Sequence, residues 1–217
     1  MVLPLSLAWW SRQGEKEFRS RIVSSGFALL LLAQIIAQFL YSERGTAPRW
    51  QEMMPLHLCD LALFSCVFAC ISRKQVFFEI AYFWGLAGTI HGLFTPDLDT
   101  GFPAVQFWLF FIGHGGIVGC ILYLVAGLRF RPIAKSVSRA YLMLLAYGVI
   151  SGVFNAFFGT NYGYTRAKPG SGSLMDFLGD WPWYIVSLAV LAVVSFLILY
   201  LPWWIKDRLG QEVPETR

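Results

Sequence analysis

Apolar stretches close to twenty residues long recur along the whole chain, and this recurrence restricts its fold more than any other feature. A helix needs about 20 apolar residues to cross the hydrocarbon core of a bilayer. Lipid offers no hydrogen bonds to the backbone, so only helices or a closed barrel can cross it. The stretches are continuously apolar rather than alternating, which favours helices. The sequence therefore predicts an all-α, polytopic membrane helical bundle.

The composition supports this class and narrows the partners. The 217 residues are 57% hydrophobic and 14% charged, whereas soluble domains carry about 25% charged residues. The net charge is +4, but no basic run alternates with aromatic residues, so we expect no nucleic-acid partner. The four cysteines lie in apolar stretches without the CxxC spacing of zinc or thioredoxin-like motifs.

We expect about six transmembrane helices. The first five predicted spans cover residues 22–40, 53–71, 76–94, 104–127 and 137–158; the sixth follows the aromatic stretch 181–184 and ends near Trp204. This divides the chain into an N-terminal cytoplasmic or interfacial segment (1–21), a transmembrane domain (22–204) and a cytoplasmic tail (205–217).

The distribution of basic residues predicts the orientation. With the amino terminus inside, thirteen of the seventeen lysines and arginines fall in cytoplasmic segments. The outer loops hold Arg44, Arg49, Arg166 and Lys168. Positive charge concentrates on the cytoplasmic side of membrane proteins. Both termini are therefore predicted to be cytoplasmic.

Ionisable side chains in the predicted spans and amide or acidic side chains in the outer loops indicate a site. Ionisable groups within a membrane are costly and mark functional positions. His57, Cys59 and Asp60 lie within four residues at the entry to the second span, and His114 lies among glycines in the fourth. The candidate site residues, all expected in the outer half or at its floor, are His57, Cys59, Asp60, His91, Asp97, His114, Asn155, Asn161 and Tyr162.

The spacing of these residues suggests how a thiol would be activated. At ~100° per helical residue, His57 and Asp60 project within about 60° of each other and Cys59 points nearly opposite His57. Cys59 then needs its base from another span, and His114 is the best candidate, because a thiolate is the reactive form of cysteine. His57 and Asp60 would orient groups or line a headgroup site, and Asn155 or Asn161 would donate hydrogen bonds to an oxyanion. Cys66 and Cys70 are interpreted as packing residues.

Six short blocks carry a family resemblance. They are PLHLCD (55–60), TPD (95–97), FP (102–103), FIGHG (111–115), GTNY (159–162) and WPWY (181–184). In this order they resemble the YwaF family of integral membrane proteins, which is related to transmembrane protein 164 of animals. The resemblance covers about residues 53–184. It implies acyltransferase activity that places polyunsaturated chains on ether-linked phosphatidylethanolamine, with a cysteine–histidine pair at Cys59 and His114.

Three functions remain open at this stage. The first is an intramembrane lipid acyltransferase or transacylase of the cell membrane, working through a thioester and without a cofactor or metal. Its site would face the outer leaflet, and its partners would be donor and acceptor phospholipids. The second is a metal-dependent lipid hydrolase with His57, His91, His114 and Asp60 as ligands. The third is a transporter, carrier or assembly factor. The oligomeric state is left open.

Overall fold

The computed structural model describes residues 2–13, 15–42, 49–96, 98, 100–170 and 172–210. Regular elements within these residues are all helical, as predicted. The α-helices are α1 (Val2–Ser11), α2 (Lys16–Ser42), α3 (Leu58–Ser72), α4 (Gln75–Ile80), α5 (Leu86–Phe94), α6 (Val105–Ala126), α7 (Ala134–Phe158) and α8 (Trp183–Arg208). A π-helical turn, η2 (Ala81–Gly85), joins α4 to α5, and 3₁₀ turns cover Trp50–Glu52 (η1), Tyr162–Tyr164 (η3) and Leu174–Leu178 (η4).

Five helical stretches of the described residues are long and apolar enough to cross a membrane. They are α2, the continuous stretch from α4 through α5 (Gln75–Phe94), α6, α7 and α8. The chain is thus a multi-pass membrane protein. Helix α3 is also apolar but has only 15 residues, which gives it a length of ~22 Å against a hydrocarbon core of ~30 Å.

The second predicted span differs most from the structure. It was expected to begin at residue 53, but helix α3 begins at Leu58, and His57 before it is extended with φ −67° and ψ 153°. A proline disfavours helical geometry in the residue before it, so Pro55 opposes a helix through Met54. The carboxylate of Asp60 accepts the backbone N–H of His57 at 3.0 Å, which fixes the helix start.

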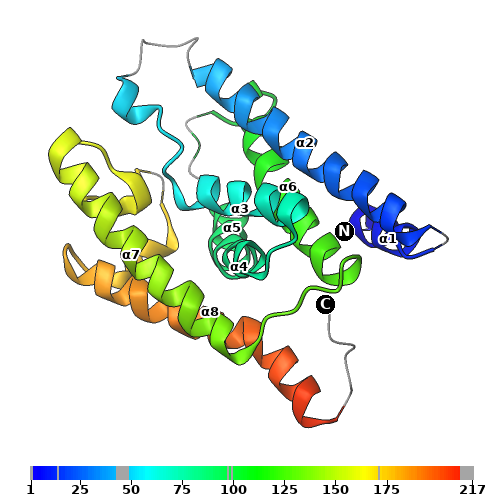
Figure 1. Cartoon of the computed structure of the whole chain (residues 1–217). Coiled ribbons are helices and arrows are strands. Elements are labelled where there is room, and N and C mark those ends of the chain that lie inside the picture. The colour runs from blue at the N-terminus through cyan, green and yellow to red at the C-terminus, as the bar shows by residue number, and fades with distance from the viewer. Residues whose placement is uncertain are drawn as a thin grey trace.

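Helix α3 lies at the centre of the molecule, packed by α2, α4, η2 and α6 (Figure 1). Helices α7 and α8 form an antiparallel pair along one side, while α2 and α6 lie on the other (Figure 1). Helix α1, expected to be interfacial, packs on α6 and α2 and buries Ala8 and Ser11. The bundle therefore has α3 and the α4–α5 stretch at its centre, between two flanking layers.

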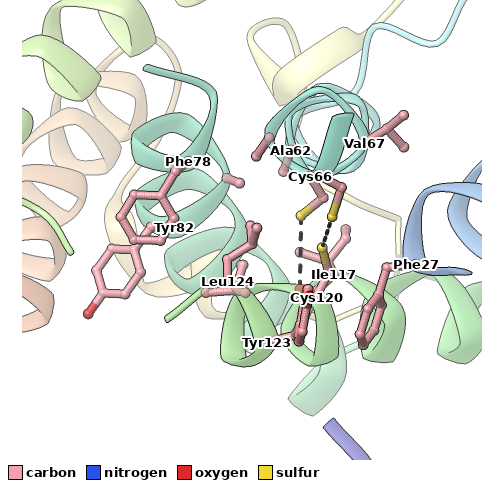
Figure 2. Close-up of a cluster of buried hydrophobic side chains, with 14 of the residues drawn as sticks. Phe27, Ala62, Cys66, Val67, Phe78, Tyr82, Ile117, Cys120, Tyr123 and Leu124 are labelled. Atoms are coloured by element: carbon pink, nitrogen blue, oxygen red, sulfur yellow. Dashed lines mark hydrogen bonds between the residues drawn. The ribbon is translucent and has the colours of Figure 1, made fainter. Parts of the chain in front are cut away.

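Part of the hydrophobic core lies where α3 meets α6 (Figure 2). Cys66, Cys70 and Cys120 are buried there; the Cys70 and Cys120 sulfurs are 3.5 Å apart, and Cys66 Sγ lies 4.0 Å from the carbonyl of Ile117. The two α3 cysteines predicted to be packing residues lie inside this core. Glycines on α6 admit α2 closely, since a Cβ at Gly113 would lie 2.8 Å from the Gln34 side chain.

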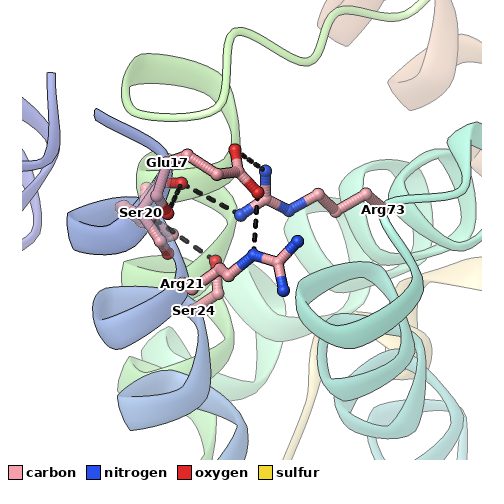
Figure 3. Close-up of polar contacts among 6 residues, drawn as sticks. Glu17, Ser20, Arg21, Ser24 and Arg73 are labelled. Carbon is pink, nitrogen blue, oxygen red and sulfur yellow. Dashed lines mark hydrogen bonds and ion pairs between the residues drawn. The ribbon is translucent and has the colours of Figure 1, made fainter. Parts of the chain in front are cut away.

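Charged contacts gather the predicted cytoplasmic segments at one end of the bundle. Glu17 at the start of α2 pairs with Arg21 at 2.8 Å and with Arg73, just after α3, at 3.2 Å (Figure 3). At the same end, Arg131 pairs with Asp207 at 2.6 Å, and Gln75 donates to the carbonyl of Arg131 at 2.8 Å. Helix α3 therefore runs antiparallel to α2, with its first turn directed toward the opposite end.

Candidate functional site

A cavity of about 1590 Å³ lies between the α7–α8 pair and helices α2, α3, α5 and α6. Sites for drug-sized ligands measure about 300–1,000 Å³, so this cavity accommodates a larger molecule. The loop that follows α7 covers part of it through residues 163–166 and 173–178. Five of the predicted site residues line the cavity: His57, Cys59, Asp60, His91 and His114.

The first turn of α3 presents Cys59 to the cavity. Cys59 is half-buried and is the second residue of the helix. The first N–H groups of a helix have no intrahelical acceptor, so they can bind an oxygen anion at this point. The angle of about 60° expected between His57 and Asp60 on one helix does not apply, because His57 lies outside the helix. It pairs with Asp60 through its backbone N–H, and its ring packs on Tyr162 with the centroids 4.9 Å apart.

His114 is held in a defined orientation on α6. Its Nδ1 lies 2.9 Å from the carbonyl oxygen of Phe110, and its ring stacks on the Phe110 ring at 3.9 Å. A carbonyl only accepts, so Nδ1 carries the proton of the neutral imidazole and Nε2 keeps its lone pair. Nε2 points toward α5, where a Cβ added to Gly92 would lie 3.2 Å away. Nε2 therefore lies next to α5, and both His114 and Gly92 line the cavity.

Asn155 shapes the loop after α7 and does not line the cavity. The side chain is fully buried, and its Nδ2 donates to the carbonyl of Tyr162 at 2.8 Å and to Thr165 Oγ1 at 2.7 Å. Its Oδ1 accepts from Thr160 Oγ1 and from the Tyr162 N–H. Both amide hydrogens are used, so the predicted role of Asn155 as an oxyanion donor is wrong.

Asn161 and Tyr162 also act on the backbone rather than on the cavity. Asn161 Oδ1 accepts the N–H groups of Arg166 and Ala167 at 3.1 Å, and its Nδ2 donates to the Ala167 carbonyl at 2.8 Å. Asn161 therefore braces the loop, in place of its expected role at an oxyanion. Tyr162 donates its hydroxyl to the carbonyl of Gln51 at 2.7 Å. Burial, followed by the nearby Asp60 carboxylate, raises the pKa of Tyr162 to about 12, so this donor stays protonated.

The remaining predicted residues do not assemble a metal site. His91 is exposed near the end of α5, where its carbonyl accepts from the N–H and hydroxyl of Thr95. Asp97 lies outside the described residues. In the part of the chain that the structure describes, no three His, Cys, Asp or Glu side chains come close enough to share an ion. The ligand set of His57, His91, His114 and Asp60 is therefore not brought together.

Sequence reasoning missed two residues of the cavity. Tyr147 of α7 donates its hydroxyl to the carbonyl of Leu56 at 2.9 Å and so holds the segment before α3. The sequence predicts Arg166 only as a basic residue of an outer loop, yet it lines the cavity. A tyrosine hydroxyl in a mostly apolar span was the signal that could have indicated Tyr147. No local motif indicates Arg166, because its position depends on the fold of the loop.

The fold and the cavity define a multi-pass helical membrane protein with a large cavity lined by one cysteine and three histidines. The family model of the TMEM164 family matches residues 1–200, and the chain belongs to this family. This confirms the relation predicted from the six sequence blocks.

The comparisons also give one curated relative. An uncharacterized protein of Treponema pallidum (strain Nichols) is 26% identical over 155 residues, which cover 70% of this chain and 63% of the relative. The match therefore spans less than two thirds of the length of that relative. No solved structure matches the chain.

Proposed function

We propose that the protein is an intramembrane lipid acyltransferase or transacylase that uses Cys59 as nucleophile and His114 as base. The observation that supports this most is that both side chains line one cavity, which is large and mostly apolar. Its substrates would be phospholipid-type donors and acceptors. From the charge asymmetry of the sequence, we infer a cell-membrane protein whose cavity is reached from the outer leaflet.

The proposed reaction has two halves. In the first, His114 Nε2 takes the thiol proton, and the Cys59 sulfur attacks the ester carbonyl of the donor. The free N–H groups of the first turn of α3 stabilise the oxyanion of the tetrahedral intermediate. Its collapse breaks the ester C–O bond, and His114 gives its proton to the departing alcohol. A thioester on Cys59 and a deacylated lipid result.

In the second half, His114 accepts the proton of the acceptor hydroxyl, and that oxygen attacks the thioester carbonyl. Collapse of this intermediate breaks the C–S bond, forms the new ester and returns the proton to the thiol. No cofactor is required, because neither half changes an oxidation state.

The short α3 favours transfer to an alcohol over hydrolysis. If its charged end lies at the cytoplasmic boundary, its first turn lies roughly 8 Å inside the opposite boundary of the hydrocarbon core. Exclusion of water from a site protects a reactive acyl intermediate from hydrolysis. Cys59 at this depth would meet lipid hydroxyls more often than water.

Intact-mass measurement after incubation with phospholipid tests the proposal. The purified protein should gain one acyl chain, and hydroxylamine should remove it because a thioester is labile to this nucleophile. Cys59→Ala should show no adduct, whereas Cys66→Ala should retain it, because Cys66 is buried in the core between α3 and α6. Full transfer activity in folded Cys59→Ala protein would refute the nucleophile. Lipid transport without any adduct would instead indicate a carrier.

A further inference from the structure

We propose that Arg166 is the phosphate-binding residue of the cavity and holds the phosphodiester of a glycerophospholipid above Cys59. This inference rests on the proposed function in one respect, namely that the cavity takes a phospholipid. It adds a binding site and a basis for choosing phospholipids over neutral glycerolipids.

The charge of the cavity points to Arg166. Among the described residues that line it, Arg166 is the one lysine or arginine. Its acidic lining residues are Asp60, bound to the His57 N–H, and Glu52, paired with Arg49 at 2.7 Å. A phosphodiester is an anion, and a guanidinium binds two of its oxygens through parallel N–H bonds. Arg166 is therefore the natural partner for a phosphate at this cavity.

One hydrogen bond within the protein anchors the Arg166 guanidinium and leaves its other N–H donors for a ligand. Its NH1 donates to the carbonyl of Asn155 at 3.3 Å, at the carboxyl end of α7. That bond uses one of five guanidinium N–H donors. Arg166 is exposed and lines the cavity, so its remaining donors are accessible to a ligand. The arrangement directs the side chain while leaving it able to bind a ligand.

Hydrogen bonds within the loop after α7 fix the backbone at Arg166. Asn161 accepts its N–H at 3.1 Å, Asn155 binds Thr165 at 2.7 Å, and Trp181 Nε1 donates to the Thr165 carbonyl at 3.2 Å. Asn155, in the last turn of α7, and Asn161, just after that helix, thus hold the backbone at and beside Arg166. A preorganised arginine loses less freedom on binding than one in a mobile loop.

The same loop lies against the first turn of α3. The His57 ring packs on Tyr162 at 4.9 Å and on Tyr164 at 6.1 Å. Tyr147 bonds to Leu56, three residues before Cys59, and its hydroxyl also lies against Gly163, three residues before Arg166. In a glycerophospholipid, only the glycerol backbone separates the phosphate from the acyl esters. One lipid can therefore offer its phosphate to Arg166 and an ester to Cys59.

Equilibrium binding tests this without relying on catalysis. The Cys59→Ser protein, reconstituted in detergent micelles, is titrated with a fluorescent diacyl phospholipid and with the matching diacylglycerol, which lacks the phosphate. Arg166→Gln should weaken phospholipid binding about tenfold, the loss expected for charge-assisted hydrogen bonds. Diacylglycerol binding should not change, and Arg166→Lys should recover part of the affinity.

Lys168→Gln is the matched control. It removes the same charge from the same loop, but Lys168 lies over the Tyr184 ring at 5.7 Å rather than in the cavity lining. It should leave both affinities unchanged. Equal weakening of both lipids by Arg166→Gln, or no weakening, would overturn the proposal. Displacement of phospholipid by millimolar inorganic phosphate alone would also overturn it, in favour of a free-phosphate site.

The outcome also separates this inference from the acyltransferase proposal. A phosphate-dependent loss of binding in Arg166→Gln, with no acyl adduct on Cys59 in the wild-type protein, refutes the reaction and keeps the lipid site. An adduct that forms from phospholipid and diacylglycerol equally well in both wild-type and Arg166→Gln proteins refutes the role of Arg166 and keeps the reaction.

Discussion

At the scale of single residues, the orientation of His114 is fixed by its contacts with Phe110 and α5. Its Nδ1 bond to Phe110 leaves Nε2 as the basic nitrogen, and Gly92 of α5 gives that nitrogen its space. Cys59, in the first turn of α3, has N–H donors of the same turn beside it. In the proposed reaction, Cys59 would supply the nucleophile, His114 the base and the first turn of α3 the donors to an oxyanion.

The first prediction is that Cys59 and His114 act as a unit. Cys59→Ala should abolish acyl transfer, His114→Ala should lower its rate by about 10²–10⁴-fold, and the double variant should be no worse than Cys59→Ala. Rates are measured from transfer of a labelled acyl chain in micelles. Multiplicative losses, with His114→Ala lowering the residual rate of Cys59→Ala further, would assign the two residues to separate tasks.

The second prediction concerns Gly92. The Cβ of Gly92→Ala would lie 3.2 Å from His114 Nε2 and 3.3 Å from its Cδ2, so the imidazole must shift by a few tenths of an ångström. Displacement on this scale lowers rates strongly, so acyl transfer should fall about tenfold or more while thermal stability changes little. Gly88→Ala, one turn earlier, is the control, because its Cβ meets only Leu58 at 3.4 Å. Equal rates in the two variants would contradict the assigned position of the base.

At the scale of the elements, the loop after α7 is the part that the cavity depends on most. Tyr162 bonds this loop to Gln51 in the segment before α3, while Asn155 and Tyr147 of α7 bond to the loop and to that segment respectively. Gly163 lies where they meet, with φ +63°, and a Cβ there would lie 2.8 Å from the Tyr147 hydroxyl.

The third prediction follows from Gly163. Gly163→Ala should lower the free energy of unfolding by about 1–3 kcal/mol, because a positive φ and a contact with Tyr147 both oppose a side chain. Gly170→Ala is the control, since its Cβ meets nothing within 4 Å and its φ is not positive. Thermal unfolding in detergent measures both. A Gly163→Ala protein as stable as Gly170→Ala would mean that the loop adapts.

The sequence predicted the long helices well and the beginning of α3 poorly. Long apolar runs alone locate α6, α7 and α8, because hydropathy sets their extent. At Met53–Leu56 the same criterion fails, since these residues are apolar but not helical. The helix start depends on the bond between Asp60 and the His57 N–H. An acid three residues after a candidate N-cap was the visible signal, although histidine is not a usual capping residue.

Site residues were predictable only where they lie in spans. His57, Cys59, Asp60, His91 and His114 reach the cavity because ionisable groups in apolar segments turn inward. Asn155 and Asn161 were given the wrong partners, because a side-chain amide bonds equally well to a ligand or to nearby backbone, and spacing does not distinguish the two. Arg166 depends on that same loop geometry and carries no periodic signal.

At the scale of the whole molecule, two ion pairs between predicted cytoplasmic segments lie at one end of the bundle, and the first turn of α3, which lines the cavity, lies toward the other. The pairs Glu17–Arg73 and Arg131–Asp207 join four segments predicted to be cytoplasmic. Helix α3 ends among these charges, and its first turn points away from them. The bundle therefore brings these four predicted cytoplasmic segments to one end, while their side of the membrane stays a prediction.

The fourth prediction concerns the orientation of the protein in the membrane. Intact cells expressing Ser173→Cys should react with a membrane-impermeant maleimide, whereas Arg129→Cys should react only after the membrane is opened. The wild-type protein measures the background from its own four cysteines. Labelling of Arg129→Cys in intact cells would show that the orientation is the reverse of the predicted one, with the cavity toward the inner leaflet.

The large volume and apolar lining of the cavity have a consequence for selectivity. A lipid that enters it from the bilayer exchanges one hydrocarbon environment for another. The hydrophobic free energy that drives apolar ligands from water into a pocket is therefore almost absent, just as it is for helix association in lipid. Under the proposed function, discrimination among acyl chains would come from how well their bends and length match walls such as Leu188 and Leu191. Retention of the proposed lipid would depend on its polar end, because partitioning alone would select no substrate.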